Sequence, residues 1–362
     1  MIKLLFIAII SISTVITAFA ENKFQPEESD FPELDTAIVN YMKRADVVGM
    51  SVAIIYKERL VYRKAYGYVD SVAKRPADIN HMFRIASMSK PVTVIALLKL
   101  VEQGRLNIDS KVFGPGSILG EDLGPVPEGS MKDRITVRHL IEHKSGWAGK
   151  MAYTGYNDYP DAHAMVSAGL AGYELAFAPG DSTMYSNFGY GVLGRVIEKL
   201  SGMKYHDYVR KYILDPCGIG QMKLAKGPVA DRDPYESNYY ADDEQSDMIH
   251  PAISNYFDSF GGWIATPTEY ARFVLHTDRQ TGIPDILPAE ILNITYFKGL
   301  WSHGGMLPGT ATNVTRLTDD LTMIYMANTW RFFNPYFDEM YNCVRKPIVA
   351  RDTWPDYDLF EK

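Results

Sequence analysis

Apolar residues alternate or run together in short stretches near both ends of the chain, whereas the middle shows the wider spacing of helices. This pattern predicts strands over 51–56, 60–62, 65–69, 310–317 and 321–327, with turns at 57–59 and 318–320. It predicts helices over 31–48, 87–104, 136–143 and 189–200, one opening at 266–269, and one over 332–344. Residues 114–129 are rich in glycine and proline and 225–258 are polar and aromatic, so both are expected to be loop-rich.

Because both ends carry the sheet signal and the centre is mostly helical, the sequence favours an α/β sandwich built from the two ends. We expect residues 21–105 and 262–362 to form this sandwich domain, and residues 106–261 to form an inserted, mostly helical domain. The chain is long enough to bury a large core, in one large domain or in two that pack closely. The crevice between the two parts is then the expected place for a functional site.

The N-terminal residues 1–20 differ from the rest and predict a cleavable secretory signal peptide. Lys3 supplies a positive start, residues 4–18 are almost wholly apolar, and Ala18-Phe19-Ala20 is a small-x-small cleavage site before the polar Glu21. We therefore expect cleavage after Ala20 and a secreted or periplasmic protein without a stable membrane anchor. A retained anchor is the alternative, but the apolar run is short for a bilayer span and no stop-transfer pattern follows it.

Charge and cysteine content narrow the expected partners. The formal net charge of −7 becomes −8 when Lys3 leaves with the signal peptide, and no basic cluster is present to neutralise phosphates. Nucleic acid is therefore not an expected partner, and the acidity is interpreted as a solubility feature. Export would permit a disulfide between Cys217 and Cys343, whereas two buried free thiols are the simpler alternative. Two cysteines are too few for a zinc cluster.

A serine and a lysine three residues apart open one of the predicted helices. Ser87 and Lys90 would share a helix face. A partly desolvated lysine can lose its proton near neutral pH and then draw the proton from a serine hydroxyl. At a helix N-terminus, backbone N–H groups also point at a developing oxyanion. Two further Ser-x-x-Lys pairs occur, at Ser71/Lys74 and Ser201/Lys204. The first lies in a polar turn and the second at a helix stop, so context selects Ser87.

Two later motifs can complete a site around this pair. Tyr185-Ser186-Asn187 can place a phenol near Lys90 as a proton relay, with Asn187 holding the lysine or the substrate. The alternative is a buried tyrosine with an asparagine N-cap. His303-Gly304-Gly305 has glycines that would let substrate backbone approach an edge strand, whereas the alternative is a glycine turn with a surface histidine. Lys144-Ser145-Gly146 is another candidate for this third motif, but it precedes the tyrosine motif in the chain.

Residues 139–143 match the H-x-x-E-H pattern of inverted zinc peptidases. On a helix, His139 and His143 would share a face and could hold a metal with a third ligand such as Glu174 or Glu198. The favoured interpretation is a helix whose histidines cap or pack, so no metal is expected.

With these motifs in this order, the chain resembles the serine β-lactamase and penicillin-binding protein superfamily. It is most similar to the branch of class C β-lactamases, D-Ala-D-Ala carboxypeptidases and related esterases. The resemblance extends from about Phe31 to Trp330 and is carried by FRIASMSK at 83–90, ITVRHLIEHKSGW at 135–147, YSNFGYGVLGRVIEKLSGMKYHDYV at 185–209, FGGWIATPTEYARF at 260–273 and HGGMLPG at 303–309. It implies a β-lactamase/DD-peptidase-like fold of the α/β (α+β) class, an antiparallel sheet with flanking helices plus the inserted helical domain.

The resemblance also implies a mechanism of acylation followed by deacylation on a small-molecule or peptide substrate. Ser87 would attack a carbonyl carbon and form an acyl-enzyme. Lys90 and Tyr185 would share the general-base and general-acid work. No metal or organic cofactor is implied, and residues 135–147 match a segment that is usual in this family without metal.

Other residues would bind the substrate by the same resemblance. Asn187 would orient Lys90 or the substrate amide. His303, beside Gly304 and Gly305, would face the substrate and Tyr185. By position, the backbone N–H groups of Ser87 and Met306 would form the oxyanion hole, although Met306 is bulkier than the small residue common there.

The third motif departs from the family pattern of Lys-Thr-Gly. His-Gly-Gly at 303–305 lacks the threonine hydroxyl and the fixed positive charge that help to bind a β-lactam carboxylate, which weakens the β-lactamase interpretation. Arg316 on the following strand is a hypothetical replacement for that charge. Tyr153, Tyr156 and Tyr159 can line the cleft and favour an apolar acyl group, whereas surface tyrosines are the alternative.

The leading hypothesis is a secreted serine hydrolase that cleaves an ester or an amide through Ser87, with esterase or D-amino-acid peptidase activity ranked above β-lactamase activity. The alternatives are a penicillin-binding protein that acylates but deacylates slowly, a non-catalytic interaction module on the same fold, and a zinc peptidase. A scaffold would not need the complete set of Ser87, Lys90, Tyr185 and Asn187, which argues against the module.

Overall fold

The computed structural model describes residues 29–147, 159–242, 245–331 and 337–361. The predicted signal peptide and two of the three cleft tyrosines, Tyr153 and Tyr156, lie outside the described residues. Searching the helices of the described part finds none with the length and apolar character needed to cross a bilayer.

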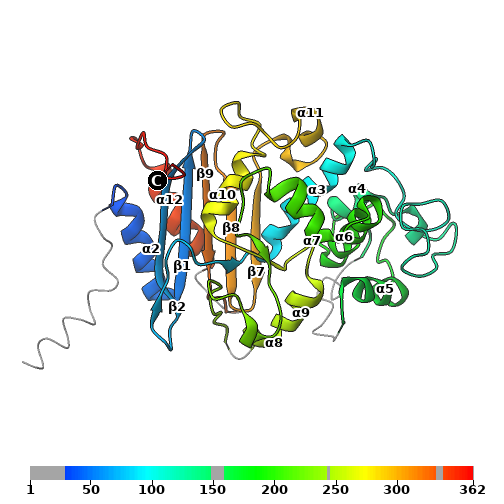
Figure 1. The fold of residues 1–362 in the computed structure, drawn as a ribbon, viewed down its shortest axis with the longest axis horizontal. Helices are drawn as coiled ribbons and strands as arrows, with labels where there is room; N and C mark the ends of the chain where they lie inside the picture. Colours follow the sequence, from blue (N-terminus) through cyan, green and yellow to red (C-terminus); the bar gives the residue numbers. More distant parts are fainter. Residues whose placement is uncertain (1–28, 148–158, 243–244, 332–336, 362) are drawn as a thin grey trace, which may run out of the picture.

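Strands from both ends of the chain form one antiparallel sheet of six strands, in the order β3-β2-β1-β9-β8-β7 (Figure 1). They are β1 (Gly49–Tyr56), β2 (Arg59–Asp70), β3 (Arg75–Pro76), β7 (Ser302–Leu307), β8 (Thr310–Arg316) and β9 (Leu321–Ala327). Helices α2 (Pro32–Ala45) and α12 (Phe337–Val349) cover one face, and α10 (Pro267–Leu275) covers the other. The antiparallel sheet with flanking helices confirms the predicted fold class.

The central strand β1 is buried on both faces, which accounts for its run of apolar residues. Val52 and Ile54 belong to the buried cluster shared with α2 and α12, whereas Ala53 and Ile55 belong to the cluster on the opposite face. Because successive side chains point to opposite faces, a strand covered on both sides needs apolar residues at every position.

The hairpin that joins β1 and β2 has a turn that suits the twist of its strands. Lys57 and Glu58 both have positive φ values, 48° and 59°. Two successive left-handed residues are the geometry of the preferred two-residue hairpin turn. The strands predicted separately over 60–62 and 65–69 form the single strand β2.

Helices and a second, smaller sheet extend from the α10 side of the main sheet (Figure 1). The other helices are α3 (Ser89–Glu102), α4 (Val137–Ile141), α5 (Ala162–Gly172), α6 (Asn187–Ser201), α7 (Tyr205–Val209), α8 (Gln245–Met248), α9 (His250–Tyr256) and α11 (Ala289–Leu292). Short 3-10 helices are η1 (Ala86–Met88), η2 (Lys132–Arg134), η5 (Val229–Asp231) and η6 (Tyr296–Lys298), and η4 (Arg210–Leu214) is a short π-helix. The smaller sheet pairs β4 (Phe83–Arg84), β6 (Trp263–Ala265) and β5 (Lys223–Leu224). One buried apolar cluster extends from the helices onto the main sheet, and the domain boundaries stay a prediction.

Three differences from the predicted elements bear on the site. The helix expected from Ser87 begins at Ser89, because residues 86–88 first make a tighter turn. The helix expected over 136–143 ends at Ile141. Residues 302–307 form the edge strand β7, which the apolar pattern did not predict because every second residue is exposed. The closing helix also extends to Val349 instead of ending at 344.

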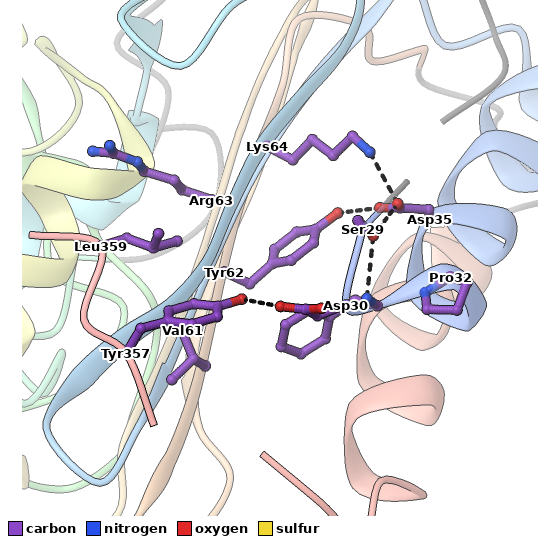
Figure 2. Close-up of a pocket in the computed structure, with 11 residues that line it drawn as sticks. Ser29, Asp30, Pro32, Asp35, Val61, Tyr62, Arg63, Lys64, Tyr357 and Leu359 are labelled. Atoms are coloured by element: carbon purple, nitrogen blue, oxygen red, sulfur yellow. Dashed lines mark hydrogen bonds and ion pairs between the residues drawn. The ribbon is translucent and has the colours of Figure 1, made fainter. Parts of the chain in front are cut away.

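A buried carboxylate fixes α2 to the sheet beside an open groove of about 910 Å³ (Figure 2). Asp35 on α2 accepts hydrogen bonds from Ser29 Oγ (2.5 Å), Lys64 Nζ (2.9 Å), Tyr66 Oη (2.5 Å) and the Tyr62 phenol. Burial raises the pKa of this carboxyl group, but the four hydrogen bonds outweigh it and leave the pKa below its usual value. The charged form of Asp35 is therefore the one that stabilises the fold.

Replacing Asp35 with asparagine is expected to lower the free energy of unfolding by about 3 kcal/mol at pH 7, because the variant leaves Lys64 and two phenols without their anionic acceptor. The folded pKa is lower than the unfolded value of about 3.9, so the contribution is present above that pH and disappears as the pH falls through the folded pKa. Urea unfolding at neutral and acidic pH measures both effects. Asp352→Asn, at an exposed position of the C-terminal segment, is the control. An equal loss for both variants would contradict the prediction.

Candidate active site

Four of the predicted residues meet around one hydroxyl group. The Lys90 amino group donates to Asn187 Oδ1 (2.7 Å) and to the Phe260 carbonyl oxygen (3.0 Å), and its Nζ atom lies in hydrogen-bond contact with Ser87 Oγ (3.1 Å). The Tyr185 phenol donates to Ser87 Oγ (2.8 Å) across a sequence separation of 98 residues. Ser87 lies in η1, Lys90 in the first turn of α3, and Asn187 at the start of α6, which packs against α3. Contact between these helices therefore assembles the cluster.

Lys90 lies in an apolar and aromatic environment. The ring centres of Tyr185, Tyr190 and Phe260 are 4.8, 5.5 and 5.8 Å from its Nζ atom. The side chain is fully buried, and burial lowers the pKa of its amino group well below the usual value, with no compensating carboxylate among the described residues. The neutral amine is thereby favoured, and a neutral amine beside a serine hydroxyl can accept its proton.

The structure does not agree with the alternative in which Asn187 is the N-cap of α6. Ser186, not Asn187, is the N-cap of α6, and its hydroxyl accepts the Gly189 N–H (3.1 Å). The Asn187 amide oxygen is therefore free to hold Lys90.

The backbone directly before Ser87 is strained. Ala86 has a φ of 48°, in the left-handed region that disfavours residues with a side chain. Strand β7 lies against this turn at Gly305, where an added Cβ would lie 2.4 Å from the Ile85 carbonyl oxygen. A glycine at 305 is therefore required by close contact within the chain, and its part in substrate binding stays a prediction. At Gly304 the nearest atom to such a Cβ, the Thr312 oxygen, is 3.8 Å away, which leaves space beside the strand.

The register of β7 determines which of its N–H groups leave the sheet. The Arg316 N–H donates to the Trp301 carbonyl (3.0 Å), which makes these two residues a hydrogen-bonded pair. Because such pairs alternate along an antiparallel ladder, the N–H groups of Ser302, Gly304 and Met306 point away from β8. The Met306 N–H therefore faces the free edge, on the strand that contacts η1 and Ser87.

His303 and Tyr185 line the same cleft, which has a volume of about 760 Å³. The Nδ1–H of His303 donates to the Gly304 carbonyl oxygen (2.8 Å). Burial and the Lys90 charge lower the pKa of this imidazole to about 4, so His303 is neutral at pH 7 and does not supply a fixed positive charge. Apolar side chains of Ile108, Ile141 and Ile294 form part of the cleft wall.

Comparison with known proteins identifies the family. The family model described as Beta-lactamase matches residues 34–339. The chain belongs to the Beta-lactamase family. Members of this serine β-lactamase and penicillin-binding protein superfamily are serine hydrolases that act on small-molecule or peptide substrates.

The relatives of this Beta-lactamase family chain are distant or match in part. Penicillin-binding protein 4* of Bacillus subtilis (strain 168) is 32% identical over 177 residues, which are 46% of this chain and 35% of the relative. Protein flp of Staphylococcus aureus (strain MW2) is 27% identical over 250 residues, 66% of this chain and 46% of the relative. The chain thus spans less than half the length of these relatives. The D-amino acid amidase structure from Ochrobactrum anthropi has the same fold, with a TM-score of 0.70, 21% identity and coverage of 88% and 99% of the two chains.

The histidines of the H-x-x-E-H pattern do not share a helix face in this Beta-lactamase family member. Helix α4 ends before His143, which has a left-handed φ of 58°. His139 accepts the Thr136 N–H at its Nδ1 (3.2 Å) and completes a capping box. Within the described residues, no group of three or more His, Cys, Asp or Glu side chains is placed to hold a metal ion. His143 instead packs on Tyr185, a role that only the long-range contact reveals.

Arg316 does not provide the charge that the third motif lacks. Its side chain is 1% exposed, lies 3.9 Å from the Asp319 carboxylate and does not line the cleft, so that hypothesis is wrong. Tyr159 packs edge-on against Tyr256 with ring centres 5.5 Å apart and also lies outside the cleft lining. Cys217 is a buried free thiol and Cys343 a half-buried one, which agrees with the simpler alternative to a disulfide.

Proposed function

We propose that this chain is a serine hydrolase that cleaves an ester or an amide through an acyl-enzyme on Ser87. The observation that carries the proposal is the position of one hydroxyl group between two proton carriers. Ser87 Oγ lies 3.1 Å from Lys90 Nζ and 2.8 Å from Tyr185 Oη, and Tyr185 lines the neighbouring cleft. A serine next to a neutral amine and a phenol is an activated nucleophile.

In the proposed reaction, the neutral Lys90 amine accepts the Ser87 proton, directly or through Tyr185, as Ser87 Oγ attacks the substrate carbonyl. The N–H groups of Ser87 and Met306 stabilise the oxyanion. Tyr185 returns the proton to the leaving oxygen or nitrogen as the acyl-enzyme forms. Water then attacks the acyl-enzyme by the same proton route in reverse, and the Asn187 amide oxygen keeps Lys90 in place throughout.

Esters and D-amino-acid amides or peptides are the favoured substrates. His303 is neutral, and the His-Gly-Gly motif has no threonine hydroxyl. The site therefore lacks the positive charge and the hydroxyl group with which a Lys-Thr-Gly motif binds a β-lactam carboxylate. The isoleucines in the cleft wall and the fold shared with a D-amino acid amidase support this ranking. Reaction with penicillin is the second candidate, and the partial match to penicillin-binding protein 4* favours it.

Intact-mass analysis of the purified protein after exposure to a fluorophosphonate, and separately to a penicillin, tests the proposal, with the adduct mapped by peptide sequencing. A fluorophosphonate adduct on Ser87 is the expected result. An additional stable penicillin adduct would favour the second candidate, and a hydrolysis assay would detect rapid penicillin turnover. A folded protein that gives no adduct on Ser87 with either reagent would overturn the proposal.

Replacing Tyr185 with phenylalanine is expected to lower kcat about a hundredfold, because the phenol carries the proton between Ser87 and the leaving group. Turnover of a p-nitrophenyl ester measures the effect. Tyr235→Phe, which removes the hydroxyl of an exposed tyrosine outside the cleft lining, is the control. A near-normal rate for Tyr185→Phe would assign the proton transfer to Lys90 alone.

Export is part of the proposed function, because the sequence of residues 1–20 has the properties of a signal peptide. Expression of the whole chain in a secreting host is expected to release a protein whose N-terminal sequence begins at Glu21. N-terminal sequencing measures this. Retention of the full-length chain in the membrane fraction would support the anchor alternative.

A further inference from the structure

His143 packs against Tyr185 and contacts the backbone on both sides of it. The His143 carbonyl oxygen accepts the Met184 N–H (2.8 Å), and the His143 Nδ1 atom accepts the Ser186 N–H (3.1 Å). One residue therefore holds the backbone N–H groups of the residues before and after Tyr185. The left-handed φ of 58° at His143 shows that its backbone adopts an unfavourable conformation to reach this position.

The imidazole ring also supports the phenol ring. The ring centre of His143 lies 4.5 Å from that of Tyr185 and 5.1 Å from that of Tyr190, tilted by 34° to each. Tyr185 is 42% exposed, so one side of its ring faces the cleft. The contact with the His143 ring thus limits how far this exposed tyrosine can turn away from Ser87.

The protonation state of His143 is set by the same contacts. A backbone N–H can only donate, so Nδ1 carries no proton and the neutral ring has its proton on Nε2. Burial and the charges of Lys90 and His303 lower the pKa of His143 to about 3. Protonation would turn Nδ1 into a donor and break its bond with Ser186. His143 therefore does not fit a proton carrier in the reaction.

We propose that His143 is a positioning residue that fixes the Tyr185 phenol on Ser87 by bracketing residues 184–186 and stacking on the ring. This proposal rests on the proposed acyl-transfer function of Ser87. It gives the second histidine of the H-x-x-E-H pattern a structural partner in place of a metal.

Two substitutions separate the hydrogen bond from the ring. His143→Phe keeps a ring against Tyr185 but removes the acceptor for the Ser186 N–H. His143→Asn removes the ring but places an amide oxygen near the Nδ1 position, and asparagine tolerates a left-handed φ. We expect His143→Phe to lower kcat by about 10- to 100-fold with KM little changed, since misplacement of a catalytic group by about 1 Å can cost 10² in rate. His143→Asn is expected to keep a larger share of kcat.

Combination with Tyr185→Phe tests whether His143 acts through the phenol. If it does, His143→Phe has no further effect on kcat when Tyr185 is already phenylalanine, so the two losses do not add. His139→Phe is the matched control, because His139 also accepts a backbone N–H at Nδ1 but caps α4 and does not line the cleft. The control is expected to lower stability and leave kcat unchanged.

A readout that is independent of activity separates this proposal from the proposed function. 3-Fluorotyrosine at position 185 of the otherwise natural protein is expected to give one narrow ¹⁹F signal, and His143→Phe is expected to shift and broaden it while urea unfolding shows a folded protein. Unchanged signals in both His143 variants would overturn the positioning role, as would fully additive kinetic losses with Tyr185→Phe. A changed signal in a protein whose Ser87 does not react with fluorophosphonate would retain the positioning role and reject the proposed function.

Discussion

Replacing Ser87 with alanine is expected to abolish ester and amide hydrolysis, with kcat lowered by about 10³-fold or more, while the protein stays folded. The substitution removes the proposed nucleophile, whose hydroxyl group contacts both Lys90 and Tyr185. The Ser87 side chain is half-buried and bonds only to these two groups in the described structure, so the free energy of unfolding is expected to change by about 1 kcal/mol or less. Turnover of a p-nitrophenyl ester and urea unfolding measure the two quantities.

The chain supplies matched controls for this substitution. Ser71 and Ser201 begin the two other Ser-x-x-Lys pairs, and neither lines the cleft. Ser71→Ala and Ser201→Ala are expected to keep normal turnover. Retained turnover in Ser87→Ala would contradict the assignment of the nucleophile, whereas loss of turnover in a control would show that the assay reports on stability.

Replacing Lys90 with methionine is expected to lower kcat by about 10³-fold and, at the same time, to stabilise the fold. The variant loses the base beside Ser87 but keeps a side chain of similar length among Tyr185, Tyr190 and Phe260. The folded pKa of Lys90 is well below its unfolded value of about 10.4, so the unfolded chain binds more protons and stability rises with pH between the two values. Methionine has no ionisable group to bury, so the variant avoids the free-energy cost of holding the Lys90 amine in the apolar interior. We therefore expect its free energy of unfolding at pH 7 to be higher by about 1 kcal/mol or more.

Urea unfolding of both proteins from pH 6 to pH 9 measures the stability effect, and the gap between them is expected to narrow as the pH rises. Lys90→Arg is the control for charge, because guanidinium stays protonated and cannot act as the base. Turnover in Lys90→Arg close to that of the natural protein would contradict the role of a neutral amine at this position.

The sequence predicts those parts of the site whose residues are close together along the chain. Ser87 and Lys90 lie close together because they are neighbours along one short segment, and the apolar run after them predicts the buried helix. The strands of the sheet were predicted where burial on one or both faces leaves an apolar pattern. Strand β7 was missed because Ser302, Gly304 and Met306 are exposed at a sheet edge and leave no such pattern.

Contacts between distant segments could not be predicted in this way. His143 meets residues 184–186 only after α4 and α6 have packed, and its sequence context pointed to a cap or a metal ligand instead. The tight turn at 86–88 and the close approach of Gly305 to Ile85 likewise depend on the third dimension. The sequence therefore did not indicate that Gly305 also has to be a glycine because of contact with Ile85.

The order of strands in the main sheet also has a consequence for folding. β1 pairs with β2 on one side and with β9 on the other, so Met50 lies opposite Ala327 and most of the chain stands between them. During synthesis, β1 exposes an unpaired edge until the last strands have been made, and closing so long a loop is slow compared with forming a hairpin. Strand β7, which contacts the turn that carries Ser87, joins the sheet in the same late step. A nascent chain of this topology is therefore open to aggregation until it is nearly complete, so its folding yield depends on protection of the β1 edge during that interval.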